Sequence, residues 1–239
     1  GATTQNLTLS GLTTAQAGAY SVHVSSPFGT ATSNAGTLTI GYAPVVLTQP
    51  VDRNATVGTN TTFVVDVNGT APFAYQWQRD VNGSYADIGG ATDSNYTLSN
   101  VQLADTGNYR VQILNTFGNI TSNAASLTAG IAPSIVSHPA DLNGTVGTDV
   151  TIYVTAAGTD PLSYQWRKDG VDLNGSTTQN LTLNGLTTAQ AGAYSVHVSS
   201  PFGNITSNAG TLTIGYAPVV LAQPVDRNAT VGTNTTFVV

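Results

Sequence analysis

Thirteen asparagines of this chain stand in the sequence Asn-x-Ser/Thr, the acceptor sequence for N-linked glycans. They are 13 of 20 asparagines, whereas random placement of the 56 serines and threonines among 239 residues gives about 5. The acceptor asparagines are Asn6, Asn54, Asn60, Asn68, Asn82, Asn95, Asn119, Asn143, Asn174, Asn180, Asn204, Asn228 and Asn234. We predict covalent glycans on these side chains and no bound cofactor; the alternative is that threonine-rich strands produce the motif as a by-product.

Other residues with useful chemistry are sparse. His23 and His197 occupy equivalent positions, each between two valines, so alternation points both of them outward from a strand. His138 lies beside a proline in a loop. A metal site needs several convergent ligands and a nucleophile needs an adjacent base, and neither set recurs in the sequence. We therefore predict no catalytic residues, no metal site and no enzymatic activity.

The charged residues exclude several other functions. Lys168 is the only lysine, so most repeats cannot form a lysine–asparagine isopeptide bond, and none of the 12 acidic residues lies in the Gly-Tyr-Ala-Pro segments where junctional calcium would need carboxylates. A net charge of −6 leaves no basic patch for nucleic acid or an anionic membrane. Apolar runs are far shorter than the roughly 20 residues that span a bilayer. Without cysteine, the chain has neither disulfides nor thiolate chemistry.

The elements that must position these residues are repeated. Residues 1–65 recur as residues 175–239 with only five differences. A weaker repeat lies inside this one, because similar junctions begin at Gly41, Gly130 and Gly215 and each leads to an Ala-Pro pair. The array therefore alternates two related domains, called A and B below. We predict four segments: the second half of a B domain at 1–41, a complete A domain at 42–130, a complete B domain at 131–215 and the first strands of another A domain at 216–239.

Short runs of alternating apolar and polar residues fill each repeat. In the A domain, Phe63 and Val65 alternate with polar or outward-facing neighbours, and Tyr109 and Val111 alternate with Arg110. Alternation with period two, broken by turn residues every 8 to 12 positions, is typical of an antiparallel sandwich. Residues that helices favour, such as Glu, Lys and Met, are nearly or wholly missing, so we expect no helices.

Particular motifs resemble the immunoglobulin fold. Tyr75-Gln76-Trp77 and Tyr164-Gln165-Trp166 resemble its strand C with the core tryptophan, and Asp105-Thr106-Gly107-Asn108-Tyr109 resembles the tyrosine corner before strand F. In the B domains the corner keeps only Gly-x-Tyr, at Tyr20 and Tyr194. The chain is similar to the cysteine-free immunoglobulin-like repeats of large prokaryotic surface and filament proteins.

This resemblance implies where the core lies. The two disulfide positions of the family fall on Val65 and Val111 in the A domain and on Val154 and Val196 in the B domain, so hydrophobic packing replaces the bridge. Each tyrosine hydroxyl of the corner is expected to bond to backbone a few residues upstream. Polar residues on the outer face of strands C and F are expected to form a solvated surface; the alternative is a strip that binds sugar or a partner. These residues are Gln76, Gln78, Arg110 and Gln112 in A, and Gln165, Arg167, Ser195 and His197 in B.

We expect tandem sandwiches arranged as a rod, because only about three residues join one domain to the next. The two end segments are each too small to close a sandwich. They are expected to be cut from a longer polymer rather than completed by neighbouring subunits.

The predicted function is structural: an extracellular or cell-surface stalk or filament whose partners are adjoining repeats or further copies of the chain. Cell-surface glycans or proteins are further possible partners. The alternatives are an adhesin or carbohydrate-binding module of a large surface protein, and an accessory region of a secreted enzyme.

Overall fold

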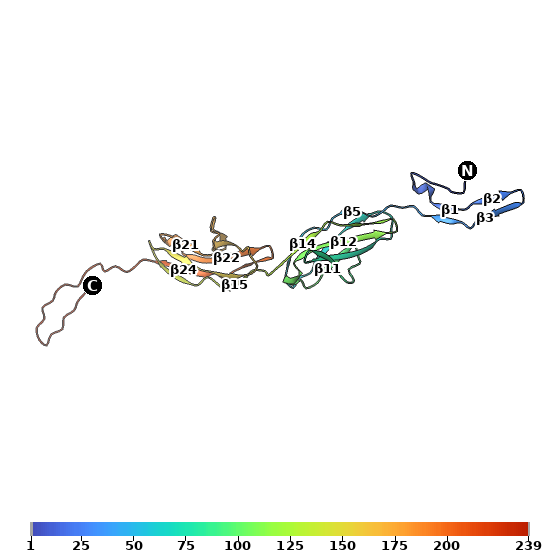
Figure 1. The fold of residues 1–239 in the computed structure, drawn as a ribbon. Coiled ribbons are helices and arrows are strands. Elements are labelled where there is room, and N and C mark those ends of the chain that lie inside the picture. Colours follow the sequence, from blue (N-terminus) through green and yellow to red (C-terminus); the bar gives the residue numbers. More distant parts are fainter. Residues whose placement is uncertain (1, 239) are drawn as a thin grey trace. The chain divides into compact units, whose positions relative to one another are not determined.

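The computed structural model describes residues 2–238, and its regular structure there is almost entirely β (Figure 1). The chain divides into two compact units, Gly1–Gly130 and Ile131–Val239. The expectation of no helices needs one correction, because three short 3-10 helices precede the F strands. They are η1 (Thr14–Gln16), η2 (Leu103–Asp105) and η3 (Thr188–Gln190).

The first 41 residues form two small antiparallel ladders, in which β1 pairs with β4 and β2 pairs with β3. The strands are β1 (Gly18–Tyr20), β2 (His23–Ser26), β3 (Gly29–Thr32) and β4 (Gly36–Leu38). None of the residues described in this segment is buried.

The A domain is a two-layered sandwich within the first unit. One layer is a six-stranded sheet of order β10-β9-β12-β14-β6 with β13 paired to β12, and the strands of the other layer form the pairs β11-β7 and β5-β8. Its strands are β5 (Val45–Thr48), β6 (Arg53–Thr56), β7 (Thr61–Val64), β8 (Asp66–Asn68), β9 (Ala74–Val81), β10 (Ser84–Asp87), β11 (Asn95–Leu98), β12 (Gly107–Asn115), β13 (Gly118–Thr121) and β14 (Ala125–Gly130).

The B domain repeats this plan within the second unit. Its six-stranded sheet has the order β16-β24-β22-β19-β20 with β23 paired to β22, opposite the pairs β17-β21 and β15-β18. Its strands are β15 (Ser134–Ser137), β16 (Leu142–Thr145), β17 (Val150–Ile152), β18 (Thr155–Ala157), β19 (Ser163–Lys168), β20 (Val171–Asp172), β21 (Leu181–Leu183), β22 (Gly192–Ser200), β23 (Gly203–Thr206) and β24 (Gly210–Gly215). The described residues beyond β24 form no strand or helix.

Alternation along the strands sets which side chains enter each core. Phe63 and Val65 are buried, while Val64 between them is exposed. In β12, Tyr109, Val111 and Ile113 are fully buried. Their intervening residues face away from the core, as a period of two requires. The sequence pattern therefore identified the inward face correctly.

Each core is built around one tryptophan. Trp77 and Trp166 are both fully buried, and each indole N–H donates to a backbone carbonyl, of Asp93 and Thr178 respectively, at 3.0 Å. The four valines at the family's disulfide positions are confirmed as buried core residues beside these rings: Val65 and Val111 with Trp77, and Val154 and Val196 with Trp166. Val111 pairs directly with Trp77 across β12 and β9, and Val196 with Trp166 across β22 and β19. Packing of apolar surface therefore takes the place of a covalent bridge.

The two cores differ in aromatic content. In the A domain the ring of Phe63 stacks on Tyr109 with centroids 5.1 Å apart and lies 6.1 Å from Trp77. Tyr96 extends this cluster to both rings. Ile152 is the counterpart of Phe63 in the B domain, so its tryptophan packs against aliphatic side chains there. The same sandwich thus accepts different packing at one inward position.

Replacing Trp166 with alanine tests the core. Removing a large buried aromatic side chain costs about 3–5 kcal/mol, so we expect Trp166→Ala to lower the free energy of unfolding of the B domain by that amount. Val171→Ala in the same domain is the control, because Val171 is 70% exposed and is expected to change stability by less than about 0.5 kcal/mol. Urea unfolding followed by circular dichroism measures both; equal midpoints for the two variants would contradict burial of the indole.

Candidate functional site

All thirteen acceptor asparagines lie at the surface. Every one of them is exposed, whether it stands in a strand, such as Asn95 in β11, or in a turn, such as Asn82 between β9 and β10. Exposure is a requirement for glycosylation rather than a proof of it, because most of the other asparagines are exposed as well. Asn115 is the one asparagine of the described residues that is half-buried, and it has no acceptor sequence. Its amide donates to two backbone carbonyls, so this side chain has a structural role.

The acceptor positions include both turns and strands of the sandwich. Asn82 adopts a φ of 55° and is followed by Gly83 at 86°, a combination suited to the tight turn that joins β9 to β10. Asn119 and Asn204 occupy equivalent sites in β13 and β23, where the earlier repeat carries Thr30 instead. The positions therefore cover both turns and strand faces of each domain.

The histidines make local hydrogen bonds. Nδ1 of His23 lies 2.9 Å from the hydroxyl of Thr32, and the equivalent His197 lies 3.0 Å from Thr206. Nδ1 of His138 accepts the backbone N–H of Asn208 at 3.0 Å. No group of three or more histidine, aspartate or glutamate side chains within residues 2–238 is arranged to hold a metal ion.

The polar face of strands C and F in the A domain differs from the solvated strip that the sequence predicted. Gln78 is only 6% exposed; its amide donates to Asp87 at 2.7 Å, and its carbonyl accepts from Arg110 Nε at 2.9 Å. The guanidinium of Arg110 stacks over the ring of Tyr85, 3.8 Å from its centroid. These cross-strand contacts hold β9, β10 and β12 together, so the Gln78 amide and Arg110 Nε are not simply solvated.

Gln76 in the A domain and its counterpart Gln165 in the B domain also form structural hydrogen bonds. Gln76 donates to the carbonyls of Trp77 and Ile88, and Gln165 donates to those of Trp166 and Leu173. Each glutamine therefore ties the strand that carries the tryptophan to the segment that follows it. The prediction of solvated side chains was wrong for these residues because cross-strand partners were not visible in the sequence.

The tyrosine corners are confirmed in all three repeats. The hydroxyl of Tyr109 donates to the carbonyl of Asp105 at 2.8 Å, and those of Tyr20 and Tyr194 donate to Gln16 and Gln190 at 2.7 Å. Each acceptor is the last residue of a 3-10 helix, so the bond joins that helix to the strand that follows it.

In each of the two complete domains, a basic side chain donates hydrogen bonds to the backbone of the segment that forms the tyrosine corner. Arg79 donates to the carbonyls of Ala104 and Thr106, and in the B domain Lys168 donates to the carbonyl of Ala189 at 2.8 Å. Burial raises the pKa of Tyr109 to about 12, with Arg79 opposing the shift and Asp105 adding to it. The corner is therefore a structural hydrogen bond in a poorly hydrated setting rather than a reactive group.

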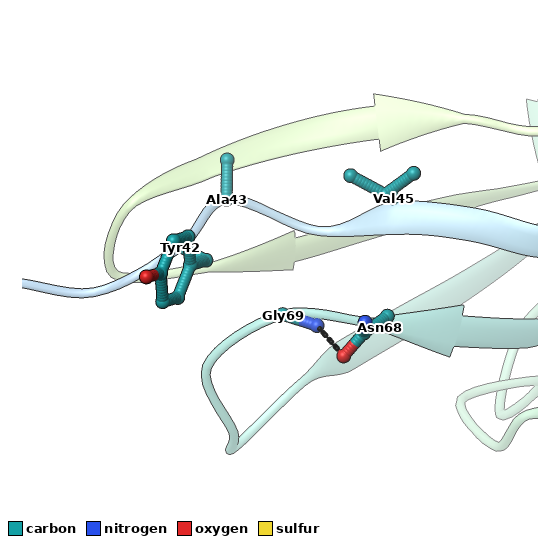
Figure 2. A pocket seen from close by; sticks show the side chains of 5 residues that line it. All are labelled: Tyr42, Ala43, Val45, Asn68 and Gly69. Atoms are coloured by element: carbon teal, nitrogen blue, oxygen red, sulfur yellow. Dashed lines mark hydrogen bonds between the residues drawn. The ribbon is translucent and has the colours of Figure 1, made fainter.

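A shallow hollow of about 270 Å³ lies where the A domain begins. It is lined by Tyr42, Ala43, Val45, Asn68 and Gly69, so an aromatic ring and one of the acceptor asparagines share this hollow (Figure 2). The ring of Tyr42 is 68% exposed. Tyr42 belongs to the Gly-Tyr-Ala-Pro segment at the start of the A domain, and no sequence motif connects it with Asn68, which lies 26 positions later.

Two β-sheets packed face to face around a buried tryptophan, with a tyrosine corner before strand F, define the immunoglobulin-like class of domain. Residues 44–128 match the immunoglobulin I-set domain family and residues 132–200 match the immunoglobulin domain family. The chain is therefore a tandem array of immunoglobulin-like domains.

Similar proteins come from distant sources. Endoglucanase C of Cellulomonas fimi is 32% identical over 117 residues, which cover 48% of this chain and 11% of that protein. Roundabout homolog 1 of Homo sapiens is 28% identical over 240 residues, or 91% of this chain and 14% of that protein. The solved extracellular domains 3–5 of Drosophila OTK match with a TM-score of 0.61 at 18% identity, covering 85% of this chain and 73% of that one. Because these sources are so varied, the prokaryotic origin stays a prediction.

Replacing Tyr109 with phenylalanine tests the corner. The variant loses one hydrogen bond, so we expect its free energy of unfolding at pH 7 to fall by about 1 kcal/mol. An unfolded tyrosine ionises near pH 10 and folded Tyr109 near 12, so the hydroxyl contributes stability that is complete below about pH 10 and lost as the pH rises toward 12.

Ionisation of Tyr109 is therefore expected to lower the free energy of unfolding of the unmodified chain by about 2–3 kcal/mol as the pH rises from about 10 to 12. The variant is therefore expected to lose stability less steeply than the unmodified chain between pH 9 and 11.5, measured by urea unfolding at each pH. Parallel curves for the two proteins would show that Tyr109 ionises normally in the folded state.

Proposed function

We propose that this chain is a spacer segment of an extracellular or cell-surface protein, a stalk or filament built from tandem immunoglobulin-like domains that carry N-linked glycans. Its partners are adjoining repeats, further copies of the chain, or proteins and glycans at a cell surface. It is not an enzyme in this proposal, because neither a set of convergent metal ligands nor a nucleophile with an adjacent base recurs in the sequence.

The observation that carries the proposal is the connection between the two complete domains. The carbonyl of Gly130 accepts the N–H of Val57 within the first unit, at 2.8 Å. The next residue, Ile131, donates its N–H to the hydroxyl of Thr159 within the second unit, also at 2.8 Å. Consecutive residues are thus bonded into successive domains, and no unbonded residue is left between them to act as a tether.

The surface supports an extracellular setting. Only 8% of the residues are charged, whereas most domains stay soluble through a surface rich in charge. Exposed acceptor asparagines occur throughout both complete domains, so glycans would supply the hydration that charged side chains provide elsewhere. No helix among the described residues is long and apolar enough to cross a membrane. The similarity to the OTK domains, named as extracellular, agrees with this setting.

Glycan occupancy is the first test. We expect sugar on at least half of the thirteen acceptor asparagines in material from the native source, measured by peptide mapping with mass spectrometry. The non-acceptor asparagines Asn100 and Asn184, which are also exposed, are the internal controls. Bare acceptor asparagines throughout would remove the glycosylated surface from the proposal and make the motif a by-product of threonine-rich strands.

Stiffness at the junction is the second test. Inserting ten Gly/Ser residues between Gly130 and Ile131 creates a flexible tether, so we expect small-angle X-ray scattering to show a broader distance distribution than that of the unmodified chain. The same insertion between Gly89 and Gly90, in an exposed loop of the A domain, is the matched control and is expected to leave the interdomain distances unchanged. An unmodified chain as variable as the junction variant would contradict the spacer role.

A carbohydrate-binding module is the second candidate, and the match to Endoglucanase C favours it. In the A domain, Gln78 already pairs with Asp87 and Arg110, and Arg110 stacks on Tyr85, so these side chains are engaged in cross-strand contacts. Sedimentation of the chain with insoluble cellulose discriminates the two roles. The spacer proposal expects the protein to remain in the supernatant.

A further inference from the structure

The hollow at the start of the A domain brings together two features that the spacer role leaves unused. One is the exposed ring of Tyr42, and the other is the acceptor asparagine Asn68 at the end of β8. Figure 2 shows them on facing segments, with Tyr42 on the irregular segment that leads into β5 and Asn68 at the end of β8.

The backbone fixes the two segments against each other. The N–H of Tyr42 donates to the hydroxyl of Thr70 at 2.8 Å, and the N–H of Thr70 donates back to the carbonyl of Tyr42 at 3.1 Å. A Cβ at Gly69 would lie 2.8 Å from the carbonyl oxygen of Ala43, and the φ of Gly69 is +139°, so only glycine permits this approach. Hydrogen bonds between Tyr42 and Thr70 therefore hold the two segments together, and the side-chain amide of Asn115 donates to the carbonyls of both residues.

The amide of Asn68 is oriented for modification. Its Oδ1 accepts the N–H of Gly69 at 2.8 Å. Its Nδ2, the atom that carries an N-linked glycan, makes no hydrogen bond to any residue in the described part of the chain. A sugar attached there would begin at the wall of the hollow that Tyr42 lines.

The B domain provides an internal comparison. The reciprocal pair of hydrogen bonds between Tyr42 and Thr70, called the clamp below, is kept in the B domain. There the N–H of Ile131 donates to the hydroxyl of Thr159 at 2.8 Å, and the N–H of Thr159 donates to the carbonyl of Ile131 at 3.0 Å. However, Ile131 replaces Tyr42, and Ala157 replaces Asn68. The clamp therefore accounts for the threonine but requires neither the aromatic ring nor the asparagine, and these two are present or absent together.

We propose that Tyr42 is the docking platform for the first N-acetylhexosamine of a glycan on Asn68. The C–H face and acetyl methyl of such a sugar are apolar, and the face of an aromatic ring is a negative surface that attracts them. The sugar would cover an aromatic ring that the domain otherwise leaves in water. This inference rests on the glycosylation that the proposed function includes.

The modification itself is ordinary glycosyl transfer. A bond forms between Asn68 Nδ2 and C1 of the sugar, the bond from C1 to the pyrophosphate of an activated oligosaccharide donor breaks, and the amide gives up one proton. The chain contributes only the acceptor amide and the platform. No oxidant or reductant is needed.

The test uses the whole chain secreted from N-glycosylating cells, with each glycan trimmed enzymatically to one N-acetylglucosamine carrying a ¹³C-labelled acetyl group. A methyl above a tyrosine ring is shifted upfield by the ring current, so we expect one acetyl methyl outside the range of the others. Asn68→Gln is expected to remove that signal and thereby assign it. Tyr42→Phe is expected to keep its shift, whereas Tyr42→Ile, which installs the B-domain residue, returns it to the common range.

Tyr216→Ile is the matched control, because Tyr216 is the repeat counterpart of Tyr42 but does not line the hollow that contains Asn68. It is expected to leave the shifted methyl unchanged. If Asn68 carries sugar and Tyr42→Ile does not move the methyl, the platform is excluded while the glycosylated spacer stands. The same holds if Asn68 is bare and other acceptors are occupied. If every acceptor is bare, the glycosylation in the proposed function fails as well.

Discussion

A β-sandwich is stable only when each of its sheets covers the apolar face of the other, and this chain shows the dependence directly. Residues 1–40 and 175–214 are almost identical in sequence, yet Phe28 is fully exposed while its counterpart Phe202 is 7% exposed. Leu12 is 49% exposed, and its counterpart Leu186 is fully buried. The difference arises because β22 and β24 pack opposite β17 and β21 and beside β19, whereas β1 to β4 have no such partners among the described residues. Closure of the two layers, and not local preference, thus creates the core.

Once the layers close, the rest of each domain follows from where polar groups can be satisfied. The buried indole N–H needs an acceptor, and a loop presents a backbone carbonyl to it in both domains, before β11 in the A domain and before β21 in the B domain. The tyrosine hydroxyl finds its acceptor at the end of the 3-10 helix. Because these bonds involve backbone carbonyls, they survive the loss of the aspartate from the B-domain corner, where Gln190 stands in place of Asp105. The cores can vary as well, since Phe63 and Ile152 serve the same position.

The features that were predictable from the sequence are those governed by local period and by spacing along the chain. Alternation placed Val65 and Val111 in the core, and the Gly-x-Tyr motif placed the tyrosine corner. The pairing of Gln78 with Arg110 could not be read from the sequence because it depends on the register between β9 and β12. One missed signal was present: Thr13 and Gln16 have the spacing of a capping box, which marks the start of η1. The hollow beside Asn68 depends on a hydrogen-bonded clamp between segments that are far apart in sequence.

The alternation of two domain types has a consequence for synthesis. Tandem domains of the same sequence exchange strands readily while they fold, and this misassembly is a characteristic failure of repeat proteins. Here the neighbour of each complete domain is the other type, with a different side chain at the Phe63 site. The nearly identical copies are separated by 174 residues. A strand that leaves its own sandwich therefore meets a mismatched core next to it, which favours correct folding of each domain as the chain emerges.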